Sequence, residues 1–253
     1  QAVLDLFGRF QGGGKADLSA FWCHALLAAL LARQLAEHFD YPRAEEAYLA
    51  GLLHDVGRLA LLAALPEAYA PLFEAGLDEA SLLAQERTRF GIDHAEAGAW
   101  LAERWQLDLL FCDSLRYHHE PVERVSDAHP LVRIVALADR LGSGGWSSDD
   151  APAWGLEPDQ AEAMLARAYE DLKVIAGQFG IPVPNLPGQA AVPVADDPTV
   201  IARLAEVTSS QLLSSSAVDA ASCPAEVGPA YEALVRGARL LFGTCGAALF
   251  LPE

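Results

Sequence analysis

The chain has 253 residues, 52% of them hydrophobic and 21% charged, which is the composition of a globular protein with a sizeable core. Its formal net charge of −18 argues against broad binding to nucleic acids or anionic membranes, because both need basic surfaces. Its four cysteines lie far apart, which indicates reduced thiols in a cytosolic protein rather than a disulfide framework or a zinc knuckle. The apolar runs 25–32 and 59–65 are too short to span a bilayer, so no membrane segment is expected.

The first 16 residues hold a short apolar stretch and a Gly-Gly-Gly-Lys sequence ending at Lys15, which indicates a turn. This turn is not a phosphate-binding loop, because Ala16 stands where such a loop needs a hydroxyl residue. The chain starts at Gln1 without a methionine and stops just after an expected strand. We therefore expect it to be a piece of a longer protein.

Hydrophobic residues recur at three- and four-residue spacing from Leu18 to about Leu141 and again over 157–179, a pattern that predicts helices. Ser19 and Asp93 are expected to cap helices, and Gly91 is expected to end one. A loop rich in Gly, Ser and Asp is expected over 142–152. The expected helices span 19–38, 42–57, 66–73, 77–89, 94–105, 108–119, 130–141 and 157–179.

The last third of the chain has a different composition. Residues 181–198 contain five prolines and are expected to form an extended linker. Helices are then expected over 199–213 and 226–241, and a strand over 247–251. The predicted architecture is an all-α, multi-helix bundle over 1–180, the linker 181–198, and a partial helix and strand segment over 199–253.

The pair His54-Asp55 lies among apolar residues, where an unpartnered polar or charged group is costly to bury. A divalent metal would satisfy both side chains, because neutral imidazole and carboxylate are among its natural ligands. Neighbouring helical residues differ by about 100° in direction, so such a pair suits a wide, two-metal centre. Further candidate ligands on separate helices lie on both sides of the pair: His24, His94, His118, His119 and Asp139.

Each candidate also has an ordinary explanation when taken alone. His24 and His94 fit hydrogen-bonded core histidines, and the pair 118–119 fits a solvated helix end, where histidines complement the helix dipole. Asp139 fits an ion pair with a neighbouring arginine. A shared metal site explains all seven residues at once, which chance placement does not. Two histidines lack this context and are expected at the surface, His38 and His129.

The order His, His-Asp, His, His-His, Asp resembles the HD superfamily of metal-dependent phosphohydrolases, and in particular the ligand order of HD-GYP cyclic di-GMP phosphodiesterases. The surrounding sequence is closer to the related HDOD (HD-related output domain) family, a resemblance that covers about residues 1–180. It implies an HD-type helical bundle with a role in bacterial signalling, generally without phosphodiesterase activity. The matching stretches are 21–24, 49–59, 90–98, 105–107, 118–121 and 138–139.

The chain departs from the active relatives at two points. No Gly-Tyr-Pro motif follows His119, which weakens the expectation of cyclic-dinucleotide hydrolysis. Arg58 stands where the active relatives commonly have lysine after the His-Asp pair. An arginine offers a positive fork to a phosphate but cannot take a lysine's proton-transfer roles, and it can also simply neutralise Asp55.

The segment 231–251 resembles the opening helix and strand of a GAF sensory domain, although any amphipathic helix followed by a strand gives a similar string. The expected partners are accordingly signalling proteins or an appended sensory domain, with neither nucleic acid nor membrane among them.

Two functions remain open. The first is a cytoplasmic signalling module that works through protein contacts and retains a divalent metal site for iron, manganese or zinc, with one or two ions. The second is a metal-dependent phosphohydrolase acting on a nucleotide or cyclic dinucleotide. In it, Asp55 would bridge the metals and Arg58 would hold a phosphate oxygen of the small-molecule substrate.

Overall fold

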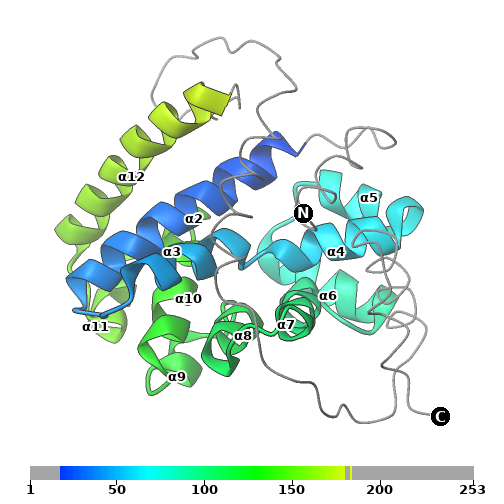
Figure 1. Cartoon of the computed structure of the whole chain (residues 1–253), viewed down its shortest axis with the longest axis horizontal. Coiled ribbons are helices and arrows are strands. Elements are labelled where there is room, and N and C mark those ends of the chain that lie inside the picture. The colour runs from blue at the N-terminus through cyan, green and yellow to red at the C-terminus, as the bar shows by residue number, and fades with distance from the viewer. Residues whose placement is uncertain (1–17, 180–182, 184–253) are drawn as a thin grey trace. The chain divides into compact units, whose positions relative to one another are not determined.

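The computed structural model describes residues 18–179 and Val183 (Figure 1). These residues form helices and connecting segments, with no strand among them, which confirms the all-α class. They divide into a larger unit, residues 18–56 and 98–179 with Val183, and a smaller unit, residues 57–97. Apart from Val183, the expected linker and the segment 199–253, including its GAF-like part, lie outside the described residues, as does the turn before Lys15.

The larger unit is built around one long apolar helix, α2, which packs against α3, α10 and α12 (Figure 1). Helix α4 begins at Val56, the last residue of the segment 18–56, and otherwise belongs to the smaller unit. The division between the units falls within α7, after Ala97. The smaller unit also holds α5 and α6. The elements are α2 (Ser19–His38), α3 (Ala44–Leu53), α4 (Val56–Ala64), α5 (Pro66–Glu74), α6 (Glu79–Phe90), α7 (His94–Arg104), α8 (Leu109–Arg116), α9 (Val122–Val125), α10 (Pro130–Gly142), the 3-10 turn η1 (Ser148–Asp150), α11 (Ala151–Trp154) and α12 (Pro158–Phe179).

Helix α2 is buried along almost its whole length, because it is rich in alanine and leucine and packs against three other helices. The closest approach is made by α3 at Gly51, where an added Cβ would lie 2.8 Å from the carbonyl oxygen of Ala28 and 2.9 Å from the Cβ of Ala32. Glycine therefore lets the two helix backbones touch. This contact carries the end of α3, and with it His54, toward α2.

By length and composition, two segments of the described chain are apolar enough to cross a membrane: 19–38, and 44–64, which runs through α3, a short turn and α4. In their most apolar windows, 78% and 72% of the residues respectively are buried within the protein. Core helices give the same signal, because they too are apolar on most sides.

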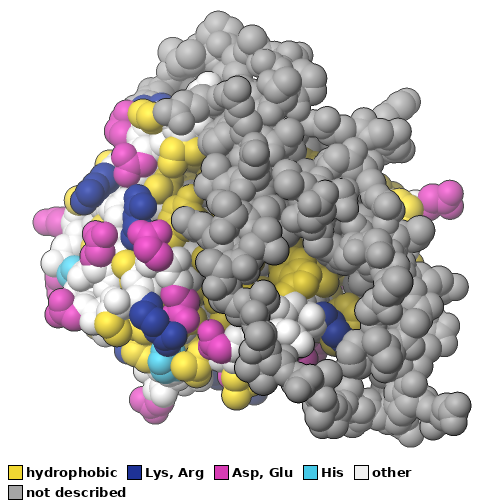
Figure 2. All heavy atoms as spheres, in the orientation of Figure 1, with side chains coloured by type: hydrophobic (Ala, Val, Ile, Leu, Met, Phe, Trp, Pro, Cys, Tyr) yellow, Lys and Arg dark blue, Asp and Glu magenta, His cyan; other side chains and the backbone are white. Residues whose placement is uncertain are grey.

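Side chains of opposite charge are mixed over the described part of the face in Figure 2, where magenta and dark blue groups are interleaved with apolar ones. Cys23 and Cys112 are buried, and neither takes part in a disulfide bond among the described residues. Burial raises the pKa of the Cys112 thiol to about 11, so it stays protonated and unreactive at neutral pH.

Several expected helix ends are confirmed, and four expectations differ from the structure. Gly91 ends α6 with a φ of 74°, and the Asp93 carboxylate caps α7 by accepting from the Glu96 amide at 2.9 Å. Ser19 is the first residue of α2 and not its cap, since the cap position is occupied by Leu18 without a side-chain hydrogen bond. Residues 148–152, the second half of the expected loop, lie in η1 and α11.

The other two differences lie at the candidate ligands. The expected helix through His54 and Asp55 is interrupted at these two residues, and the expected helix to His119 ends at Arg116. In both places a histidine Nδ1 hydrogen-bonds to the carbonyl oxygen three residues earlier, in Gly51 and Leu115 respectively. A side chain that takes a helical carbonyl competes with the backbone ladder and favours an end of the helix.

Replacing Asp108 with alanine is expected to destabilise the protein by about 1 kcal/mol, since its carboxylate caps α8 by accepting from the amides of Leu110 at 3.0 Å and Phe111 at 3.1 Å. Chemical denaturation with the exposed Asp127→Ala as control measures this. Equal stability of the two variants would show that the cap contributes nothing.

Candidate metal centre

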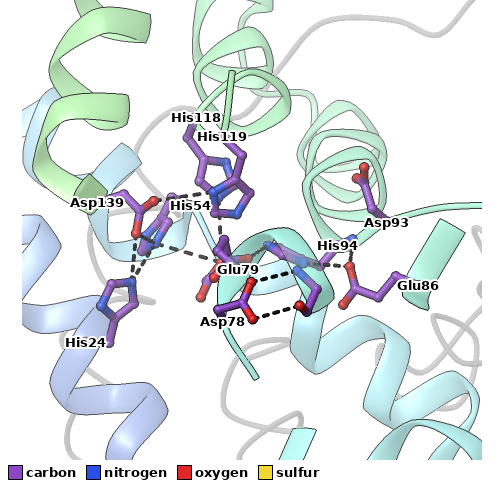
Figure 3. A network of polar contacts seen from close by, with 12 residues as sticks. His24, His54, Asp78, Glu79, Glu86, Asp93, His94, His118, His119 and Asp139 are labelled. Carbon is purple, nitrogen blue, oxygen red and sulfur yellow. Dashed lines mark hydrogen bonds and ion pairs between the residues drawn. The ribbon is translucent and has the colours of Figure 1, made fainter. Parts of the chain in front are cut away.

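Six of the seven predicted ligands lie in the larger unit, and their side chains converge (Figure 3). They come from four separate places: α2, the turn between α3 and α4, the segment after α8, and the late part of α10. The six fall into two groups, each of which has its ligand atoms within 4.8 Å of one another. One group is His24, His54 and Asp139, and the other is Asp55, His118 and His119.

Asp139 is the centre of the first group. Its Oδ1 lies 3.0 Å from His24 Nε2 and 3.5 Å from His54 Nε2, and these two nitrogens are 3.1 Å apart. Burial alone would raise the pKa of the Asp139 carboxyl, but hydrogen bonds from His119, His24 and His54 outweigh burial and hold its pKa well below the usual range. Asp139 is therefore an anion at neutral pH, as a metal ligand must be.

The second group surrounds His118. Its Nε2 lies 3.7 Å from Asp55 Oδ1, and both side chains are almost completely buried. The pKa of His118 is lowered to about 4, mainly by burial and also by the neighbouring His119, and the contact with Asp55 offsets only part of this effect. The imidazole is therefore neutral at pH 7, the form that can donate a lone pair to a metal.

The two groups adjoin each other. His54 Nε2 lies 3.8 Å from Asp55 Oδ1, and His119 Nδ1 lies 3.4 Å from Asp139 Oδ2. Asp55 and Asp139 thus each face imidazoles of both groups.

The tautomers of His54 and His118 favour a cation. Their Nδ1 atoms lie 2.7 Å and 2.6 Å from the carbonyl oxygens of Gly51 and Leu115. A carbonyl only accepts, so each Nδ1 carries the hydrogen and a neutral ring has its lone pair at Nε2. The lone pair of a neutral His118 then faces Asp55 Oδ1 at 3.7 Å, and a carboxylate oxygen also only accepts. A metal ion resolves this meeting of acceptors, and metal-binding histidines are commonly held by such a carbonyl.

The donor set of imidazole nitrogens and carboxylate oxygens fits iron, manganese or zinc. When bound, such an ion supplies Lewis acidity and activates water. His24, His54, Asp55, His118, His119 and Asp139 would hold it.

His94, the seventh predicted ligand, is the first residue of α7 and belongs to the smaller unit. Its Nδ1 lies 2.7 Å from Glu86 Oε2, and its Nε2 lies 3.4 Å from Glu79 Oε1. The inclusion of His94 in the centre stays a prediction. The sequence reasoning missed the two glutamates, since an acid on a helix usually faces solvent and nothing near them in sequence marks either one.

Arg58 lies on α4 in the smaller unit, half-buried, with its guanidinium carbon 5.4 Å from the centre of the Phe73 ring. Its expected contact with a phosphate, or with Asp55, stays a prediction.

The two histidines expected at the surface are both half-buried. His129 has a structural role, because its Nδ1 accepts from the Leu131 amide at 3.3 Å at the start of α10 and its ring meets that of Tyr41 edge-on. His38 ends α2, away from the ligand groups.

Comparisons with known proteins agree with this fold. The sequence profile of the HDOD domain matches residues 1–121, just under half of the chain. An uncharacterised protein of Treponema pallidum is 30% identical over 95 residues, which are 37% of this chain and only 18% of that protein.

Two solved structures are similar over a larger part of the chain. The MmoQ response regulator of Methylococcus capsulatus is 28% identical with a TM-score of 0.50, over 59% of this chain and 62% of that one. An HDOD domain protein of unknown function from Geobacter sulfurreducens is 23% identical with a TM-score of 0.51, over 70% and 67%. The chain therefore has the helical fold of HDOD domain proteins, and its first 121 residues match that domain in sequence.

Proposed function

We propose that the chain is a bacterial, cytoplasmic signal-transduction module of the HDOD family, which works through protein contacts and retains a site for one or two divalent metals. The observation that carries this proposal is the convergence of six imidazoles and carboxylates in the larger unit. The HDOD match over 1–121 and the similarity to a response regulator support the signalling part.

A metal at this centre would tie together four segments that are distant in sequence. Ligands from α2, the turn at 54–55, the segment 118–119 and α10 would all bind through one centre. Because binding to the folded form alone stabilises that form, metal occupancy would change the rigidity of the larger unit. Such a change is a usable signal.

A pocket on the larger unit offers a place where this signal can be read. It has a volume of about 490 Å³, and its wall includes Tyr117 and Glu120, the two residues that flank the pair 118–119 in the chain. A shift of that pair on metal binding would move the pocket wall with it. Tyr117, just after α8, is 40% exposed, and Leu109, the first residue of α8, is 70% exposed, so apolar surface is available to a partner protein nearby.

The alternative function is a phosphohydrolase acting on a nucleotide or cyclic dinucleotide. It is supported by the adjoining ligand groups, with Asp55 facing His54 and His118. In this case Asp55 would bridge the ions and Arg58 would bind a phosphate oxygen of the substrate.

Metal analysis and a hydrolysis assay separate the two functions. The purified chain is analysed for iron, manganese and zinc and then incubated with cyclic di-GMP and with bis(p-nitrophenyl) phosphate. We expect bound metal and no turnover. Turnover that is lost in His54→Ala and Asp55→Ala would favour the phosphohydrolase instead, and a protein that binds no metal would contradict both.

Replacing His24 with alanine is expected to lower the bound metal at least tenfold, because His24 Nε2 faces both His54 and Asp139. His38→Ala is the matched control, being a histidine on the same helix outside the ligand groups. Metal content and thermal unfolding are measured for both variants. An equal loss in both would show that the effect is general to α2 and not specific to the ligand.

A further inference from the structure

The smaller unit contains a buried carboxylate, Glu86, that accepts two hydrogen bonds from one histidine, His94. Glu86 is fully buried in α6, and its Oε2 accepts from His94 twice, from the backbone amide at 2.9 Å and from Nδ1 at 2.7 Å. Its Oε1 accepts from the hydroxyl of Tyr69 at 2.5 Å, another fully buried side chain. Burying a carboxylate is costly unless its oxygens accept hydrogen bonds. Here two of the hydrogen bonds come from His94, the first residue of α7 (Figure 3).

The hydrogen bond from His94 to Glu86 determines which nitrogen of a neutral His94 carries the lone pair. A carboxylate at 2.7 Å accepts the Nδ1 hydrogen, so a neutral His94 has its lone pair at Nε2. The carboxylate–histidine arrangement is the one that orients and strengthens metal-binding histidines.

The Nε2 atom of His94 is paired with a second carboxylate. It lies 3.4 Å from Oε1 of Glu79, in the first turn of α6. Two ligand atoms that each lie about 2.1 Å from a tetrahedral ion are about 3.4 Å apart, so a lone pair and a carboxylate oxygen at this spacing match two positions of one coordination sphere.

We propose that Glu79 is a further metal ligand beside His94, and that Glu86 is the positioning residue that presents His94 Nε2 to the metal. This proposal rests on the proposed function, in which the chain binds a divalent metal. It concerns residues of the smaller unit only, and the two that lie on α6 are outside the predicted ligand set. A doubly protonated His94 bridging the two glutamates is the competing explanation, and it requires no metal.

Metal affinity tests the proposal in the full chain. Zinc and manganese affinities are measured by competition with a chelator in the wild type, Glu79→Gln, Glu86→Ala and Glu86→Gln. We expect Glu86→Ala to weaken binding by about 10- to 100-fold, the range for partners that orient a ligand. Glu86→Gln is expected to recover part of this loss, because its amide oxygen still accepts from Nδ1. Glu79→Gln is expected to weaken binding by at least tenfold.

Glu74→Gln is the control, since Glu74 is an exposed carboxylate on α5 of the same unit. Its metal affinity is expected to equal that of the wild type. If Glu86→Ala does not fold, as shown by circular dichroism, Glu79→Gln still tests the proposal, because Glu79 is 38% exposed and its replacement leaves the buried carboxylate in place.

A second measurement isolates the positioning role. Nitrogen-15 NMR of the metal-free protein is expected to show His94 protonated at Nδ1 alone in the wild type and in Glu74→Gln, and a mixture of tautomers in Glu86→Ala. Metal bound equally well by the wild type and by the Glu79 and Glu86 variants would overturn this proposal and leave the proposed metal site standing. Absence of metal from the wild type would overturn both.

Discussion

Replacing Asp139 with asparagine is expected to lower metal affinity by more than about 100-fold, beyond the range seen when only an orienting partner is lost. The Asp139 carboxylate faces His24, His54 and His119 together. Asparagine keeps the shape of the side chain but removes the negative charge that attracts a divalent ion. Its amide nitrogen is a hydrogen-bond donor, which cannot act as a metal ligand in place of the second carboxylate oxygen.

The same substitution is expected to destabilise the metal-free protein by about 1–3 kcal/mol, because it disturbs a buried network that hydrogen bonds hold together. Chelator competition gives the affinity, and denaturant titration of the metal-free protein gives the stability. Asp127→Asn is the control, an exposed aspartate between α9 and α10. If Asp139→Asn keeps wild-type affinity, the metal is held elsewhere.

The helices of the described region were largely predictable because their apolar periodicity and end signals are local. Asp93, Gly91 and Pro66 occupy the cap, stop and start positions that their side chains or backbone preferences suit. The interruption at His54 was not predictable from periodicity. It depends on a hydrogen bond from the His54 imidazole to the carbonyl oxygen of Gly51. The packing around the ring, and not the local sequence pattern, determines whether this bond forms.

The candidate ligands stood out in the sequence, since a shared metal site is a common explanation for histidines and aspartates scattered over successive apolar helices. Their pairing was not predictable. The contact between Asp139 and His24 depends on the packing of two helices that are distant in the chain. The contact between Glu86 and His94 depends on the geometry of the turn between α6 and α7, which the sequence does not specify. Glutamates on helices are too common at surfaces for Glu79 or Glu86 to stand out.

The position of His54 also depends on a residue with no side chain. Gly51 lies three residues before it on α3, and an added Cβ would meet Ala28 and Ala32 of α2 at 2.8 Å and 2.9 Å. The first of these contacts is with a backbone oxygen, which cannot turn away as a flexible side chain can. The two helices must separate to admit any larger residue.

Gly51→Val is therefore expected to destabilise the protein by about 3 kcal/mol or more, the upper part of the range for overpacking, and to lower Tm by roughly 6–12 °C. It should also weaken metal binding, because separation of α3 from α2 moves His54 away from His24. Thermal unfolding of the metal-free chain and chelator competition measure the two effects.

Gly177→Ala is the matched control. Gly177 lies within α12, and nothing stands within 4 Å of the position that its Cβ would take. Alanine is a better helix former than glycine, so this variant is expected to gain up to about 1 kcal/mol and to bind metal as the wild type does. The two substitutions should therefore change the free energy of unfolding in opposite directions. The side chain at position 51 would have no room between α2 and α3, whereas the methyl group at position 177 would meet no neighbour and favour the helix. A Gly51→Val protein as stable as the wild type would mean that α2 and α3 do not touch at this point, and the placement of His54 beside His24 would lose its physical basis.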